Sequence, residues 1–121
     1  MAKKILIVDD SSMMRLVVKK AAKKEGYEVI EASNGQEGLD VLEKEDVNLI
    51  LSDINMPVMD GLEMVKRIKE NDALKYIPIV MLTTERSEDL KQKGRELGVK
   101  AWMVKPFNEA TFLKAMMKLL G

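Results

Sequence analysis

The sequence predicts a doubly wound α/β fold, in which five helices cover both faces of a five-stranded parallel sheet. Short apolar runs alternate five times with longer segments whose apolar residues recur every three or four positions. Parallel strands need right-handed crossovers, and the helices supply them. The 121 residues, 46% of them hydrophobic, suffice for one core, so we expect a single domain over residues 1–121 without an attached output domain.

Capping and turn residues mark the boundaries of these elements. Ser11 or Ser12 can cap the first helix and Gly26 can end it, while Asn108 can cap the last. The Asn34–Gly35 pair predicts a turn before the second helix. The expected strands are residues 5–8, 27–32, 49–52, 79–82 and 101–104, and the expected helices follow them at about 12–25, 36–45, 61–70, 87–97 and 109–120.

Composition excludes several classes of function. Twenty basic residues balance twenty acidic ones, so no global charge favours nucleic acid or a membrane surface. The chain has no cysteine and no histidine, which rules out disulfides, thiol catalysis, most zinc sites and Ser-His-Asp triads. No signal peptide and no apolar run long enough to span a membrane is visible, so we expect a cytoplasmic protein.

Polar residues follow four of the apolar runs directly. They are Asp9 and Asp10 after the first run, Asp53 after the third, Thr83 after the fourth and Lys105 after the fifth. In open α/β sheets ligands bind beyond the carboxyl ends of the strands. Each residue alone has an ordinary structural explanation as a helix cap or turn residue, but their joint placement predicts one functional site.

The chemistry of this set points to a metal ion and a phosphoryl group. Two carboxylates ~4 Å apart repel by roughly 4 kcal/mol at an effective dielectric of about 20, so three together need compensation or at least one must be protonated. A bound cation and Lys105 would supply that compensation. Oxygen ligands of this kind suit Mg²⁺. Aspartate can accept a phosphoryl group as an acyl phosphate, and Asp53 stands alone at its strand end.

The same residues resemble the motifs of the response-regulator receiver family, of the CheY-like single-domain type. The resemblance covers the whole chain and rests on Ile7-Val8-Asp9-Asp10, Ser52-Asp53-Ile54-Asn55-Met56-Pro57, Met59-Asp60-Gly61, Thr83-Thr84 and Lys105-Pro106-Phe107. It implies the flavodoxin-like strand order 2-1-3-4-5, which is known for CheY.

By resemblance, Asp53 is the phosphoacceptor, and Asp10 and Asp53 are direct metal ligands. Asp9 then acts through metal-bound water, and the backbone carbonyl of Asn55 is a third ligand; the residues alone do not rank Asp9 against Asp10. The family pattern also implies a cis bond between Lys105 and Pro106.

The resemblance further implies that the protein is a signalling domain and not an enzyme that turns over a separate substrate. A histidine kinase or phosphotransfer protein is the expected donor, and the face of the last two strand-helix units is expected to bind an output protein, with chemotaxis as one pathway. Thr83 and Trp102 match the switch positions, although Trp102 replaces the more usual tyrosine or phenylalanine. Asn55 and Glu85 match positions that tune the phosphate lifetime, and we expect a monomer.

Two other functions fit parts of the pattern. A Mg²⁺-dependent phosphatase also uses an aspartyl nucleophile and a lysine, but it needs an acid two residues after the nucleophile, where this chain has Asn55. A flavodoxin-like cofactor carrier needs a loop rich in Ser, Thr and Gly after the first strand, where Asp9 and Asp10 stand.

Overall fold

The computed structural model describes residues 2–121 and has strands and helices in strict alternation. The strands are β1 (Lys4–Val8), β2 (Glu28–Ala32), β3 (Leu49–Ser52), β4 (Ile79–Thr83) and β5 (Ala101–Val104). The helices are α1 (Ser12–Lys24), α2 (Gly35–Lys44), α3 (Gly61–Lys69), α4 (Glu88–Glu96) and α5 (Glu109–Leu120). The predicted boundaries agree with these to within one or two residues. No helix within the described range could span a lipid bilayer.

All neighbouring strands are parallel, in the order β2-β1-β3-β4-β5, which confirms the predicted fold class and strand order. Val8 pairs with Ala32 on one side and with Ser52 on the other. Ser52 in turn pairs with Met81, and Thr83 pairs with Val104. The last residues of β2, β1 and β3 are therefore level at the carboxyl end of the sheet, and β4 and β5 extend two residues further.

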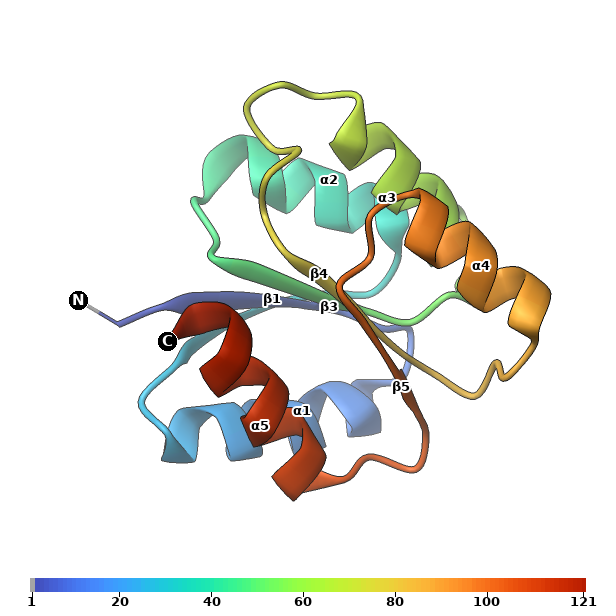
Figure 1. Ribbon diagram of the computed structural model, residues 1–121. Coiled ribbons are helices and arrows are strands. Elements are labelled where there is room, and N and C mark those ends of the chain that lie inside the picture. The colour runs from blue at the N-terminus through green and yellow to red at the C-terminus, as the bar shows by residue number, and fades with distance from the viewer. Residues whose placement is uncertain (1) are drawn as a thin grey trace.

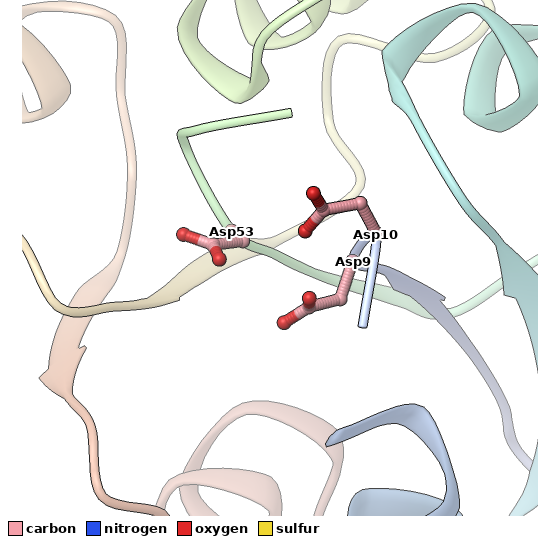
Figure 2. Close-up of side chains that lie close together, drawn as sticks. All are labelled: Asp9, Asp10 and Asp53. Atoms are coloured by element: carbon pink, nitrogen blue, oxygen red, sulfur yellow. The ribbon is translucent and has the colours of Figure 1, made fainter. Parts of the chain in front are cut away.

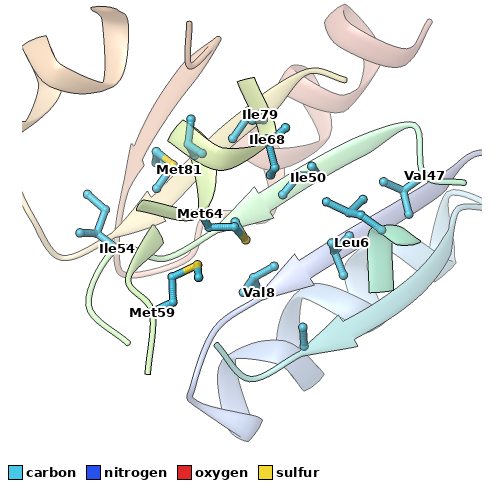
Figure 3. Packing of buried hydrophobic residues seen from close by; sticks show 13 residues of the cluster. Leu6, Val8, Val47, Ile50, Ile54, Met59, Met64, Ile68, Ile79 and Met81 are labelled. Atoms are coloured by element: carbon cyan, nitrogen blue, oxygen red, sulfur yellow. The ribbon is translucent and has the colours of Figure 1, made fainter. Parts of the chain in front are cut away.

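Two helical layers enclose the sheet (Figure 1). Helices α1 and α5 cover one face, where Phe112 and Met116 of α5 pack with Ile5, Ile7 and other strand residues. Helices α2, α3 and α4 cover the other face, where Met64 and Ile68 of α3 pack among residues of β1, β3 and β4 (Figure 3). Because both faces are covered, the central strands are apolar without alternation.

Every helix begins with a capping side chain that accepts a hydrogen bond from a backbone N–H of its first turn. The caps are Ser11, Asn34, Asp60, Ser87 and Asn108. Ser11, not Ser12, is thus the cap of α1. Asn34 and Gly35 make a helix start where the sequence predicted a turn, because the Asn34 side chain captures the N–H of Glu37.

One loop residue beside the carboxyl edge has an unfavourable backbone conformation. Val58, between β3 and α3, has φ of 69° and is 83% exposed. A left-handed conformation costs an L-residue with a branched Cβ roughly 1–2 kcal/mol, whereas asparagine tolerates it. We expect Val58→Asn to raise the free energy of unfolding by about 1 kcal/mol, measured by urea denaturation.

Val58→Ala is the matched control, because alanine removes the branched side chain but keeps Cβ and most of the strain. It should gain less than Val58→Asn. A Val58→Asn protein that is no more stable than the alanine variant would show that the left-handed conformation at residue 58 does not destabilise the folded state.

Candidate functional site

The carboxyl edge of the sheet brings the predicted acids together. Asp9 and Asp10 follow β1, and Asp53 follows β3, which lies directly beside β1. The backbone N–H of Asp53 donates to the carbonyl of Val8 at 2.9 Å, so the hydrogen bonding between β1 and β3 continues up to the site. Figure 2 shows the three side chains gathered at this strand end. Carboxylate oxygens of all three lie within 4.8 Å of one another.

Lys105, which follows β5, closes the site from the other side. Its Nζ donates to Asp9 Oδ2 at 3.0 Å and to Asp53 Oδ2 at 2.8 Å. The three side chains are 15%, 3% and 10% exposed, so these ion pairs are largely shielded from solvent. The Lys105–Pro106 peptide bond is cis. Residues far apart in sequence thus form one compact charge cluster.

The two aspartates after β1 have different environments. Asp9 is buried; its Oδ1 accepts the N–H of Ser11 at 2.9 Å while its Oδ2 accepts from Lys105. Asp10 is exposed, and its carboxylate makes no hydrogen bond or ion pair with residues 2–121. Asp10 is therefore the carboxylate that is free to bind a ligand directly.

Both oxygens of Asp53 are engaged. Oδ1 accepts the N–H of Ile54 at 2.6 Å, and Oδ2 accepts from Lys105. The adjacent Ser52 hydroxyl donates to the Asp53 carbonyl at 2.7 Å. These bonds fix the carboxylate in one orientation.

Burial raises the pKa of Asp9 above its ordinary value of 3.8, because the charged form loses hydration. The Asp53 charge acts in the same direction, while the bonds from Ser11 and Lys105 oppose it. For Lys105, burial alone would lower the pKa, but hydrogen bonds and charges of Asp53 and Asp9 together raise it above 10.5. Lys105 is therefore a permanent cation at neutral pH.

The raised pKa of Asp9 predicts a pH-dependent stability. An acid whose pKa is higher in the folded state contributes stability that is complete below the unfolded pKa, here near 3.8, and is lost as the pH rises through the folded pKa. We expect the free energy of unfolding of the wild type, minus that of Asp9→Asn, to fall as the pH rises above 3.8. Metal-free urea titrations between about pH 4 and pH 7 measure this difference.

Lys105 does not contribute in that window, since its raised pKa affects stability only above pH 10.5. A difference that rises with pH would show that the ion pair with Lys105, and not burial, dominates the titration of Asp9.

The remaining predicted residues lie around this cluster. Thr83 is buried at the end of β4, and its Oγ1 accepts the N–H of Glu85 at 3.2 Å. The Asn55 side-chain amide donates to the Glu85 carboxylate at 2.8 Å. The Trp102 indole N–H donates to the Glu85 carbonyl at 3.0 Å. Glu85 thus connects the three other residues.

The acidic cluster fits a hard divalent cation. Three carboxylates from two adjacent strand ends provide only oxygen donors, and Asp10 offers both oxygens without competition from within the described chain. The single ammonium of Lys105 does not balance three negative charges. Oxygen-only ligand sets with room for water are those that Mg²⁺ prefers.

Two further residues support the site through contacts that the sequence did not reveal. The Arg15 guanidinium donates to the Asp9 carbonyl at 2.6 Å and also pairs with Glu31, so this basic residue of α1 stabilises the backbone at Asp9. Gly61 is the first residue of α3, and its N–H donates to the Ile54 carbonyl at 2.8 Å. The Cα of Gly61 lies against the backbone of Asp53, where a Cβ would not fit. The spacing of Gly61 after Asp53 was visible in the sequence, but the close approach was not.

Comparison with known proteins gives a consistent result. The family model described as "Response regulator receiver domain" matches residues 5–117. A chemotaxis protein CheY homolog from Campylobacter jejuni is 38% identical over 120 residues, which cover 98% of this chain and 92% of that protein. The structure of the Vibrio cholerae chemotaxis protein CheY4 superposes with a TM-score of 0.92 at 43% identity, covering 98% of this chain and 99% of the other.

A relative from a different process is equally similar. The sporulation initiation phosphotransferase F of Bacillus subtilis is 38% identical over 120 residues, covering 99% of this chain and 95% of that protein. Similarity to proteins of two different processes therefore does not assign the chain to one pathway.

Proposed function

The chain belongs to the response regulator receiver family, and from this we propose that it is a phosphorylation switch whose Asp53 accepts a phosphoryl group from a histidine kinase or phosphotransfer protein. One observation carries the proposal: Asp9, Asp10, Asp53 and Lys105 converge at the carboxyl edge of the sheet. The face formed by α4, β5 and α5 would then bind an output protein.

Phosphoryl uptake forms one bond and breaks one. A carboxylate oxygen of Asp53 attacks phosphorus, and the bond from phosphorus to the donor breaks, with its electron pair leaving on the donor. The chain's own contribution is to hold the attacking carboxylate by the Ile54 N–H and to place the Lys105 ammonium where negative charge builds up. Thr83, buried at the end of β4, would donate its hydroxyl to a phosphoryl oxygen.

Asp10 and Asp53 would hold Mg²⁺ directly, with the Asn55 backbone carbonyl as a third ligand and Asp9 acting through water. The exposed Asp10 carboxylate, which makes no bond within residues 2–121, supports its role as a direct ligand. The division between Asp9 and Asp53 rests on the family resemblance, because both oxygens of each carboxylate are engaged. When bound, Mg²⁺ would supply positive charge to the phosphoryl oxygens.

Switching would pass through Thr83 and Trp102. A Thr83 hydroxyl that moves toward a phosphoryl oxygen to donate its hydrogen would stretch the bond that it accepts from the Glu85 N–H, and Glu85 also holds the Trp102 indole. Movement at the site would thus reach β5 and α4 through one residue. We propose that the protein acts as a cytoplasmic monomer, with chemotaxis, the process that several relatives' names give, as one candidate pathway.

Exposure to acetyl phosphate with Mg²⁺, followed by acid quenching and intact-mass measurement, tests the proposal. We expect one added phosphoryl group, absent in Asp53→Ala and absent when the metal is removed. A wild-type protein that gains no mass and binds no stable metal-fluoride phosphoryl mimic would overturn it. Continuous phosphate release from a phosphate ester would instead indicate a phosphatase.

A further inference from the structure

The only tryptophan of the chain is held in a defined position by α4 and by the loop before it. Trp102 lies in β5 and packs on the side of the sheet that α2, α3 and α4 cover. Its indole N–H donates to the Glu85 carbonyl at 3.0 Å. The indole is therefore held by one polar bond and by packing against the core.

Gly94 provides the space that the indole occupies. This glycine is buried in the last turn of α4, within the helix, where glycine is unfavourable compared with alanine. A Cβ at this position would lie 3.0 Å from Cζ3 and 3.3 Å from Cε3 of Trp102, closer than ordinary carbon contacts. The missing side chain thus matches the six-membered ring of the indole.

The indole has room to leave this position. A hollow of about 220 Å³ borders Trp102 on the side of α4, and a second of about 210 Å³ borders it on the side of α5. Packing thus does not enclose the indole on these two sides, and the Gly94 contact and the Glu85 bond hold it in place.

Glu85 links the Trp102 indole to the acidic site through hydrogen bonds. Its carbonyl holds Trp102, its N–H donates to Thr83 Oγ1, and its carboxylate accepts the Asn55 amide at 2.8 Å. Asn55 follows Asp53 by two residues, so the Asn55–Glu85 bond joins the loops after β3 and β4 beside the phosphoacceptor. If Trp102 moves, Glu85 loses one of its three anchors.

We propose that Gly94 and Trp102 are positioning residues that keep Glu85 bonded to Asn55, and that this bond limits the access of water to phosphorylated Asp53. The inference rests on the proposed function. In the step concerned, a water oxygen attacks phosphorus, the bond to the Asp53 carboxylate breaks with its electron pair staying on the carboxylate, and the proton of the water is released with inorganic phosphate.

Gly94→Ala is the decisive variant, because alanine favours the helix but its methyl group displaces the indole. We expect no loss of stability, a red-shifted tryptophan emission and stronger quenching by acrylamide. The acyl phosphate, formed with acetyl phosphate and then freed of donor, should decay between about twofold and tenfold faster, the range that one ordinary hydrogen bond represents. Lys93→Ala, an exposed change on the same helix, is the control and should alter neither property.

Trp102→Phe removes the indole N–H and should speed decay similarly. In the double variant Gly94→Ala/Trp102→Phe, the alanine should add nothing, because its effect passes through the indole. Two effects that add, or a Gly94→Ala protein whose emission shifts while its decay rate stays that of the wild type, would overturn the proposal.

A second readout does not need phosphorylation. The side-chain amide resonances of Asn55 should shift in unphosphorylated Gly94→Ala and Trp102→Phe, with the Asn48 and Asn71 amides as internal references. Unchanged Asn55 resonances would refute the link from Trp102 to Asn55. A wild type that takes up no phosphoryl group would refute the proposed function while these resonances still report on the link.

Discussion

Replacement of Lys105 with methionine is expected to slow phosphoryl uptake at Asp53 by about a hundredfold or more. Lys105 is the cation that contacts Asp53 and Asp9 at 2.8 and 3.0 Å, in a site that is mostly shielded from solvent. Loss of one preorganised charge-stabilising group from such a site typically costs about 10²–10³ in rate. Methionine keeps an unbranched side chain of similar length, so the change removes mainly the charge. The rate of mass gain with acetyl phosphate measures the effect.

The same substitution should make stability depend more strongly on pH. Without Lys105, the buried Asp9 and Asp53 repel each other without a counter-charge, and the pKa of Asp9, already raised by burial, rises further. The variant should therefore be less stable than the wild type by roughly 1–3 kcal/mol at neutral pH, with a smaller deficit as Asp9 takes up a proton at lower pH.

Two control variants distinguish the loss of the Lys105 charge from a nonspecific effect of replacing a lysine. Lys20→Met removes an exposed lysine of α1 and should change neither rate nor pH dependence. Lys105→Arg keeps the charge but enlarges the donor group, so it should retain the stability and lose part of the rate. A Lys105→Met protein that takes up the phosphoryl group at the wild-type rate would exclude Lys105 from the chemistry.

Local sequence signals were sufficient for most of the fold. Periodicity and capping residues act within one or two helical turns, so the five strand-helix units and their boundaries could be predicted. The strand order came from the family resemblance, because periodicity carries no information about which strands are neighbours. The convergence of Asp9, Asp53 and Lys105 followed from their place directly after strands, and the structure shows these contacts.

Features that depend on tertiary packing could not be predicted. Asp9 and Asp10 are adjacent and chemically identical, and only the turn to Ser11 and the reach of Lys105 make one buried and the other exposed. Nothing local shows that the Glu85 carbonyl accepts the indole N–H of Trp102, 17 positions further on. A glycine within a predicted helix, as at Gly94, was the one available signal for the close approach of a side chain.

Replacement of Gly61 with alanine is the second change for which we expect a large effect. A Cβ on Gly61 would overlap the carbonyl oxygen of Asp53, and it would lie 3.0 Å from the Asp53 carbonyl carbon and 3.1 Å from Ile54 Cα. All three atoms belong to backbone that pairs with β1 or anchors α3, so none can move aside independently. We expect a loss of about 2–3 kcal/mol in the free energy of unfolding, measured by urea denaturation.

Gly61→Ala should also slow phosphoryl uptake, because the backbone atoms that the new Cβ would displace belong to the phosphoacceptor Asp53. A shift of the Asp53 backbone by a fraction of an ångström moves its carboxylate away from Lys105, so phosphoryl uptake should fall at least about tenfold even where the variant is fully folded. Gly38→Ala is the matched control. Its Cβ would meet the Met64 sulfur at 2.8 Å, and that flexible side chain can move, so stability and uptake should change little. Equal losses in both variants would mean that crowding in the core, and not the position of Asp53, causes the effect.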